Sequence, residues 1–198
     1  LYGRDLALDP RLLEAARARL EAAEASAPPA PRKETLLLVI GRGTRDPDAN
    51  SNVAKVTRML WEGMDYGWAE TAYSGVAHPL GDAGLDHAAR LGYRRIVVFP
   101  YFLFTGVLVR RIYDWVDAAQ ARHPGIEFLK APYLSDHPRV VETLVDRVAE
   151  TLNGQALMNC SLCKYRERII GHEVDQGAPQ AGHHHHVRGI GTDHDHGE

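Results

Sequence analysis

The residues best suited to metal chemistry stand toward the end of the chain. Cys160 and Cys163 are separated by two residues, which lets both thiolates reach one metal centre. Seven of the 11 histidines fall from His172 onward, and the predicted metal ligands among them are His183, His184, His185, His186, His194 and His196. Imidazoles beside carboxylates suit borderline divalent ions such as cobalt, nickel and zinc. We therefore expect a metal-binding tract here rather than an expression tag.

The cysteine pair is compatible with four kinds of site. A thioredoxin-like redox motif belongs between a strand and a helix, whereas this pair follows the last expected helix. A zinc site needs further ligands, which the histidine run could supply. An iron–sulfur cluster usually takes four thiolates, so two chains would have to share it or other ligands complete it. Inert surface cysteines are the fourth alternative, and the residues alone leave the choice open.

A second region suited to chemistry is Thr35–Asn52, which reads TLLLVIGRGTRDPDANSN. Leu36–Ile40 is an unbroken aliphatic run, typical of a parallel strand that is buried on both faces. The glycines that follow permit a tight turn, and Asp46-Pro47-Asp48 is typical of a helix start. Ligands gather at such carboxyl ends of strands in open α/β sheets, so we expect a site here.

Strands and helices are expected to alternate along the chain. The strands are predicted at Leu36–Ile40, Glu70–Ala77, Arg95–Tyr101 and Ile126–Ala131. The helices are predicted at Pro10–Ala25, Asp48–Glu62, Leu80–Leu91, Leu108–Arg122 and Pro138–Asn153. The last helix is indicated by an apolar stripe of Val140, Val141, Leu144, Val145, Val148 and Leu152. Four such units predict an α/β fold, a small parallel four-stranded sheet with helices on both faces.

The first and last predicted helices have similar sequences. DPRLLEAARARLEAAEA around Pro10 resembles HPRVVETLVDRVAETLN around Pro138, 128 positions later. A domain-length offset indicates duplication. We therefore divide the chain into the end of a preceding repeat (1–25), a Pro-rich linker (26–34), a second domain (35–153) and a flexible extension with the cysteines and histidines (154–198).

The composition argues against several classes of protein. A net charge of −3 is unlike the usual basic balance of a nucleic-acid binder. The longest apolar stretch, Ile96–Val109, is interrupted by Pro100 and Gly106 and is too short to span a bilayer. Two cysteines make no disulfide framework and no signal peptide is visible, so we expect a cytoplasmic protein whose natural start precedes Leu1.

Several segments together carry a resemblance to a known family. They are GRGTRDPDAN, RRIVVFPYFLFTGVLVRRIYD, APYLSDHP, MNCSLCKYR, and GAPQ followed by HHHH. The chain resembles the long form of the CbiX-type sirohydrochlorin cobaltochelatases, which are class II chelatases of cobalamin biosynthesis. The resemblance covers nearly the whole chain and implies a flavodoxin-like sheet. Long-form members look like two fused chelatase domains followed by an M-x-C-x-x-C motif and a His-rich region.

The resemblance implies a function and a set of partners. The chain would be part of an enzyme that inserts Co²⁺ into sirohydrochlorin without a nucleotide, and the lack of a P-loop sequence agrees with this. It implies an iron–sulfur cluster on Cys160 and Cys163, and an N-terminal chelatase copy of the same protein as partner. It also allows a homodimer, and it implies neither nucleic acid nor membrane as a partner.

Two positions depart from the family pattern. Active domains carry one histidine in the first loop and one in the loop after the third strand, where this chain has Arg42 and Leu108. Neither side chain can hold a metal or receive a proton near neutral pH. We therefore expect no catalytic residue in this segment and both histidines in the preceding copy. Arg42, Arg45 and Arg110 are predicted to bind the carboxylates of sirohydrochlorin, whereas Arg111 is interpreted as a solvated helix charge.

Other hypotheses stay open beside this one. Within the same class the metal could be nickel or iron, because ligand affinity follows the Irving–Williams order rather than need. From another class, the chain would be a non-enzymatic metal-storage or redox-sensing module on a retired chelatase fold. A strand followed by G-H-G-S upstream of Leu1 would favour the enzyme. His87, His123 and His137 are interpreted as caps and surface residues, and His78 is kept as an outside candidate ligand.

Overall fold

The aliphatic run that begins at Thr35 forms a central strand in the computed structural model, which describes residues 4–6 and 8–154. The strands are β1 (Thr35–Gly41), β2 (Trp68–Tyr73), β3 (Arg95–Pro100) and β4 (Glu127–Lys130). All pairs are parallel and the order in the sheet is β2-β1-β3-β4. Leu38 of β1 lies opposite Glu70 on one side and Val98 on the other. The predicted four-stranded parallel α/β sheet is confirmed.

Both central strands are buried along their whole length. Every residue of β1 and of β3 is buried. Successive side chains of a strand point to opposite faces, and accordingly Leu37 and Val39 belong to one hydrophobic cluster while Leu38 and Ile40 belong to the other. This explains why the run lacks polar alternation, since both faces of the sheet are covered.

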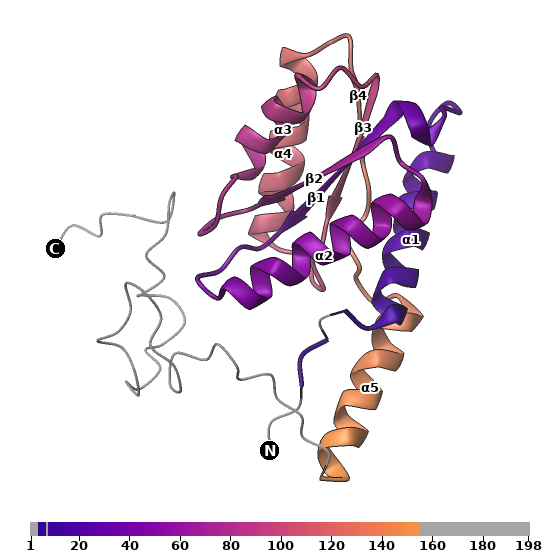
Figure 1. Cartoon of the computed structure of the whole chain (residues 1–198), viewed down its shortest axis with the longest axis vertical. Helices are drawn as coiled ribbons and strands as arrows, with labels where there is room; N and C mark the ends of the chain where they lie inside the picture. The colour runs from indigo at the N-terminus through magenta and orange to yellow at the C-terminus, as the bar shows by residue number, and fades with distance from the viewer. Residues whose placement is uncertain (1–3, 7, 155–198) are drawn as a thin grey trace, which may run out of the picture.

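The helices are divided between the two faces of the sheet (Figure 1). They are α1 (Pro10–Ala25), α2 (Pro47–Met64), α3 (Gly81–Ala89), α4 (Val107–Arg122) and α5 (Pro138–Leu152), with a 3₁₀ turn at Arg32–Glu34 before β1. Residues of α1 and α2, such as Leu20 and Leu60, pack with Val39 on one face. Residues of α3 and α4, such as Leu85 and Ile112, cover the other face. α5 packs mainly beside α1.

Three helices begin with a capping side chain followed by a proline. Asp9, Asp46 and His137 each accept a hydrogen bond from the backbone N–H two residues further on, at the starts of α1, α2 and α5. Such a cap satisfies one of the N–H groups that a first turn leaves without a partner, and proline fits the next position because it has no N–H. The predicted helix start at Asp46 and the interpretation of His137 as a cap are confirmed.

The second strand differs from its prediction. The sequence predicts a strand over Glu70–Ala77, whereas the structure has Trp68–Tyr73. The N–H of Ser74 still bonds to the carbonyl of Gly41, but Val76 then takes a φ of +66°. That left-handed conformation cannot continue an extended strand. The β-branched valine, which favours a strand by type, therefore lies in a turn.

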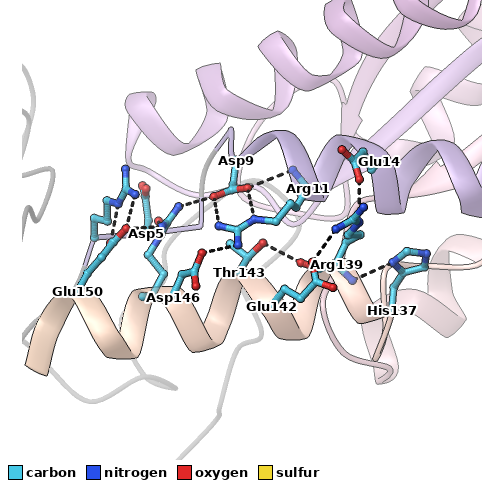
Figure 2. A network of polar contacts seen from close by, with 12 residues as sticks. Asp5, Asp9, Arg11, Glu14, His137, Arg139, Glu142, Thr143, Asp146 and Glu150 are labelled. Atoms are coloured by element: carbon cyan, nitrogen blue, oxygen red, sulfur yellow. Dashed lines mark hydrogen bonds and ion pairs between the residues drawn. The ribbon is translucent and has the colours of Figure 1, made fainter.

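The predicted last helix is confirmed, but most of its apolar stripe is exposed, whereas such a stripe usually faces the core. α5 buries Val140, Thr143 and Arg147. The rest of the stripe is between 39% and 73% exposed: Val141, Leu144, Val145, Val148 and Leu152. The side of α5 that faces α1 instead makes a network of polar contacts, which Figure 2 shows from close by. Within this network Arg147 of α5 pairs with Asp9 at 2.8 Å.

The segment between α1 and β1 is attached to the amino end of the sheet. Arg95 donates a hydrogen bond of 2.6 Å to the carbonyl of Pro28, and the N–H of Gly67 donates one of 2.7 Å to the carbonyl of Arg32. α1 and the linker are thus integral to this fold. No helix within residues 4–6 and 8–154 has the length and the apolar run that crossing a membrane requires.

Candidate functional site

The carboxyl ends of β1 and β3 form the natural binding edge of this sheet. The two strands are neighbours, but the chain leaves them in opposite directions, toward β2 and toward β4. α2, which follows β1, and α4, which follows β3, cover opposite faces (Figure 1). A crevice opens where two such connections part, and open α/β sheets bind their ligands there.

The loop after β1 is held by hydrogen bonds at several points. Asn50 accepts a bond of 3.1 Å from the N–H of Thr44 and donates one of 2.7 Å to its carbonyl. The hydroxyl of Ser74 donates to the carbonyl of Arg42 at 2.9 Å. Gly43 has a φ of +82°, and a Cβ placed there would lie 1.8 Å from the carbonyl oxygen of Gly75. The backbone of this loop is therefore fixed, and only glycine fits at position 43.

Arg42 and Arg45 lie in this fixed loop with their side chains exposed. Arg42 is the first residue after β1, so its guanidinium is presented at the carboxyl edge. A guanidinium offers donors in a planar fork that matches a carboxylate. The loop is thus able to present cations to an anionic ligand from a rigid backbone.

A hollow of about 220 Å³ lies beside this edge, on the face that α1 and α2 cover. Its wall is mostly apolar and comes from four parts of the chain: Asp5, Leu6, Leu12, Ala49, Asn52, Val53, Tyr101, Leu103 and Leu134. Burial raises the pKa of the Tyr101 phenol to about 12, so this group stays neutral at physiological pH. The hollow can accept an apolar edge of a ligand.

Arg110 and Leu108 lie on the other side of the crevice, in the first turn of α4. Leu108 is half-buried and Arg110 is exposed. Arg110 lines a second, open hollow together with Val107, Arg111, Tyr113, Asp114, Asp117 and Lys130. Of these two hollows in the described part of the chain, neither is lined by Arg42 or Arg45. The structure therefore places the predicted arginines on one edge without bringing them into one hollow.

The histidines outside the tail occupy surface and capping positions. His123 caps the end of α4 and lies 3.2 Å from Asp86, which also pairs with Arg122. His87 is exposed on α3, and His78 is exposed in the loop after β2. Among residues 4–6 and 8–154 no group of three or more His, Cys, Asp or Glu side chains is arranged to hold a metal ion.

The predicted tail ligands lie outside the described residues. They are Cys160, Cys163, His183, His184, His185, His186, His194 and His196. Their assignment as metal ligands therefore stays a prediction.

Two features of the site were missed from the sequence. Asn50 fixes the first loop through both ends of its amide, and an Asn in the first turn of a helix that follows a loop is the local signal for such a contact. The hollow combines Leu6 and Leu12 with Leu134, from opposite ends of the domain. No local sequence pattern predicts that residues so far apart in the chain line one hollow.

The fold is that of a parallel α/β domain, and such domains bind their ligands at the switch point of the sheet, which here lies between β1 and β3. The sequence model of the CbiX family matches residues 36–151. The chain therefore belongs to the CbiX family, and the resemblance seen in its motifs is confirmed.

Individual relatives agree with this assignment. A sirohydrochlorin cobaltochelatase of Priestia megaterium is 40% identical over 172 residues, which cover 87% of this chain and 56% of the relative. The sirohydrochlorin ferrochelatase of the same organism is 26% identical over 78% of this chain and 56% of the relative. SirB from Bacillus subtilis with Fe³⁺ has the same fold, with a TM-score of 0.65, 24% identity and coverage of 78% of this chain and 60% of SirB. The chain thus spans little more than half the length of the curated relatives it matches.

Proposed function

We propose that the chain is part of an enzyme that inserts Co²⁺ into sirohydrochlorin in cobalamin biosynthesis, without a nucleotide. The observation that carries this proposal is the 40% identity to the Priestia megaterium cobaltochelatase over 87% of this chain. The substrate metal is taken from that similarity. The chain spans 56% of that relative, so the proposal concerns the whole protein and assigns this segment a share of the work.

The share proposed for this segment is to bind and enclose the substrate. Metal insertion needs a group that holds the ion and a base that receives the pyrrole protons. Arg42 and Leu108, which stand where the family pattern has histidines, can do neither. We therefore assign both functions to a preceding chelatase copy in the same protein and no catalytic residue to this segment.

The size of the hollow supports a shared cavity. Ligand pockets usually measure about 300–1,000 Å³, whereas the hollow beside β1 and β3 measures about 220 Å³. A tetrapyrrole would place one edge in it and need a second wall for the rest. In this proposal the preceding copy supplies that wall, as a second subunit would in a homodimer.

Arg42 and Arg45 are the proposed contacts for the carboxylates of sirohydrochlorin. They are exposed at the carboxyl edge on a loop that hydrogen bonds hold in place. Arg110 is the third proposed contact, and Asp114 and Asp117, which line the same hollow, would compete with the substrate carboxylates for its charge. The arginines would orient the substrate and would take no part in proton transfer.

The test is an anaerobic metallation assay that follows the absorption of sirohydrochlorin. The 198-residue chain with Co²⁺ is expected to match the uncatalysed rate, and the polypeptide that includes the residues upstream of Leu1 is expected to exceed it. Turnover by the 198-residue chain that Arg42→Ala abolishes would contradict the division of labour. A lack of turnover by the longer polypeptide would contradict the enzyme itself and favour a metal-storage or redox-sensing module.

Iron is the second metal to test, because a ferrochelatase of Priestia megaterium is 26% identical over 78% of this chain. Competition between Co²⁺, Ni²⁺ and Fe²⁺ at equal concentrations would show the preference of the longer polypeptide. The proposal expects cobalt insertion to dominate, and dominant iron or nickel insertion would reassign the metal.

For the tail we propose an iron–sulfur cluster on Cys160 and Cys163. Two thiolates are half of the usual set, so two chains would share the cluster. Anaerobic purification is expected to give a brown protein with visible absorption that Cys160→Ser and Cys163→Ser each remove. Colourless protein with stoichiometric zinc would replace the cluster by a Cys/His zinc site.

The histidine tract is proposed to load the substrate metal. Deleting residues 182–198 removes His183–His186 together with His194 and His196. We expect fewer Co²⁺ or Ni²⁺ ions per chain with an unchanged far-ultraviolet circular dichroism spectrum. Unchanged metal stoichiometry would count against this role.

A further inference from the structure

The loop that connects β3 to α4 leaves two large apolar side chains in solvent at the carboxyl edge of the sheet. Phe104 is 75% exposed, and Val107, the first residue of α4, is 64% exposed. Transfer of apolar surface out of water is favourable, and exposed apolar groups that gather at a ligand edge mark binding surfaces. The rest of the loop shows why Phe104 in particular is left in solvent.

The residues before Phe104 alternate between the two faces of the sheet. Tyr101 and Leu103 pack with the cluster that α1 and α2 cover, whereas Phe102 packs with the cluster that α3 and α4 cover. Phe104 continues this apolar run but belongs to neither cluster. Its ring therefore lies beyond the core, at the edge where the sheet binds its ligand.

The loop is anchored on both sides of Phe104. Before it, the carbonyl of Phe102 accepts a hydrogen bond of 2.9 Å from the N–H of Leu134. After it, the carbonyl of Gly106 accepts one of 3.1 Å from the N–H of Arg110, which closes the first turn of α4. The exposed ring is thus presented from a backbone that is held at both ends.

Phe104 lies on the segment that joins the two hollows of this edge. Leu103, the residue before it, lines the apolar hollow of about 220 Å³. Val107, three residues after it, lines the open hollow together with Arg110. A ligand wide enough to reach both hollows would cross this segment and cover the ring of Phe104.

A tetrapyrrole has the chemistry that this segment fits. Its conjugated ring has apolar faces, and its carboxylates are carried at the periphery. Val107 and Arg110 are one turn apart on α4, so an apolar contact and a cation lie side by side there. Aromatic side chains pack on conjugated rings in offset or edge-on arrangements. Arginines can hold the periphery of such a ligand, but its face needs an apolar contact.

We propose that Phe104, supported by Val107, is the contact on which the face of the tetrapyrrole ring rests. The proposal rests on the proposed function, because it takes sirohydrochlorin as the ligand. It adds a contact for the ring face to the arginine contacts for the carboxylates. Phe104 would fix the plane of the ring relative to the groups that insert the metal.

The exposed Trp68 shows what a structural aromatic residue looks like in this fold. Trp68 is 40% exposed, but it packs edge-to-face against Trp61 with 4.7 Å between the ring centroids. Its indole N–H also donates to Glu70 at 2.8 Å. Trp68 stands at the start of β2, at the end of the sheet opposite to the binding edge. Internal contacts therefore account for Trp68, whereas Phe104 faces the ligand edge.

The test is a titration of metal-free sirohydrochlorin into the polypeptide that extends upstream of Leu1. Phe104→Ala is expected to weaken binding about fivefold or more, whereas Phe104→Trp should stay within about twofold, because an indole also offers a flat apolar face. Thr105→Ala changes the next exposed residue of the same loop, and Leu91→Ala changes an exposed leucine before β3, at the opposite end of the sheet. Both controls should stay within about twofold.

Metallation kinetics and thermal unfolding give two further readouts. A contact with the ring face is made alike before and during metal insertion. Phe104→Ala should therefore raise the KM for sirohydrochlorin about fivefold and leave kcat within about twofold. Because the side chain is exposed, the thermal midpoint without substrate should stay within about 2 °C of that of the unsubstituted protein.

The proposal is overturned if Phe104→Ala binds sirohydrochlorin as tightly as the unsubstituted protein, or if Phe104→Trp or either control loses as much affinity. A fall of the thermal midpoint by more than about 4 °C in Phe104→Ala also overturns it, since another part of the polypeptide would then cover the ring. In each of these cases the unsubstituted protein still metallates sirohydrochlorin, so the proposed function stands. An unsubstituted polypeptide that does not bind sirohydrochlorin would remove both.

Discussion

The two ends of the sheet differ in how their polar side chains are used. At the amino end Arg95 is 4% exposed and is bonded to Glu127 and to the carbonyl of Pro28, while Tyr66 is 1% exposed and donates to Glu24 at 2.7 Å. At the carboxyl end the backbone is fixed by Asn50 and Ser74, but the side chain of Arg42 is exposed. Internal partners thus satisfy the charges at one end, whereas the other end leaves the charge of Arg42 exposed.

This difference separates stability from binding. A buried ionic or phenolic group that is fully hydrogen-bonded makes the fold depend on its partners, because a lost partner leaves a desolvated polar group behind. An exposed guanidinium is well solvated and adds little to stability. Substitutions at the amino end should therefore affect folding, and substitutions of exposed side chains at the carboxyl end should affect binding.

The largest effect on stability is expected for Arg95→Ala. This substitution removes the guanidinium that now donates hydrogen bonds to the Glu127 carboxylate and to the Pro28 carbonyl. Breaking a fully buried pair costs about 3–5 kcal/mol, and because Glu127 is 41% exposed we expect about 3 kcal/mol here. Urea denaturation measures the change. The neighbouring exposed residue provides the control, since Arg94→Ala should cost about 0.5 kcal/mol or less.

Gly43→Ala tests whether the carboxyl end is rigid as well as open. Gly43 and Gly92 share a φ of +82°, but a Cβ at Gly43 would lie 1.8 Å from a backbone oxygen, whereas one at Gly92 meets nothing within 4 Å. We expect Gly92→Ala to cost about 1 kcal/mol from backbone conformation alone. Gly43→Ala should cost about 1–2 kcal/mol more because the loop must also move. Equal losses in urea denaturation would mean that the loop after β1 yields freely.

Tyr66→Phe examines the amino end through pH. The variant loses the hydrogen bond to Glu24, and its free energy of unfolding at pH 7 should be lower by about 1 kcal/mol. Burial, followed by the hydrogen bond to Glu24, raises the pKa of the Tyr66 phenol above its usual value. A group whose pKa is higher in the folded than in the unfolded protein contributes its full stabilisation of the fold below its unfolded pKa, which is near 10 for tyrosine. This contribution is lost as the pH rises above that value.

The stability of the unsubstituted protein should therefore fall more steeply than that of Tyr66→Phe above about pH 10. Denaturation midpoints at pH 8, 10 and 11 would follow the two proteins, and the 1 kcal/mol gap should shrink or reverse at the highest pH. Parallel curves would show that the phenol ionises as easily in the folded protein as in the unfolded one.

The sequence predicts best where one physical demand decides the structure. Leu36–Ile40 had to be a buried strand, because a run without polar alternation is stable only between two covered faces. The position of Arg42 at the carboxyl edge follows directly from the end of that strand. β2 was misplaced because its residues are half-exposed and give a weak pattern, while the backbone conformation of Val76 depends on the neighbouring loop.

Long-range partners explain the remaining differences. Nothing local marks Arg95 as buried, since an arginine at a strand start is usually solvated, and its partners lie in the linker and in β4. The stripe of α5 has the period of a core helix, yet α1 occupies the sheet. A helical period therefore identifies an apolar side without identifying which surface covers it.

The smallest effect on stability and the clearest effect on binding are expected for Arg42→Ala. The side chain is exposed and its loop is fixed by backbone contacts through Asn50 and Ser74, so stability should change by about 0.5 kcal/mol or less. If Arg42 bonds a substrate carboxylate, one charge-assisted contact is lost, and the affinity for sirohydrochlorin should fall about tenfold. Arg42→Lys keeps the charge but not the planar fork, so its affinity for sirohydrochlorin should lie between that of the unsubstituted protein and that of Arg42→Ala.

Fluorescence or absorption titration of sirohydrochlorin into the longer polypeptide measures this affinity. Arg94→Ala removes the same charge at the opposite end of the sheet, next to the start of β3, and serves as the matched control. Its affinity should stay unchanged, because a charge beyond one Debye length, about 8 Å at physiological salt, is largely screened. Equal losses in both variants would reduce the role of Arg42 to net charge. Unchanged affinity in Arg42→Ala would remove the carboxyl edge of this unit from the substrate site.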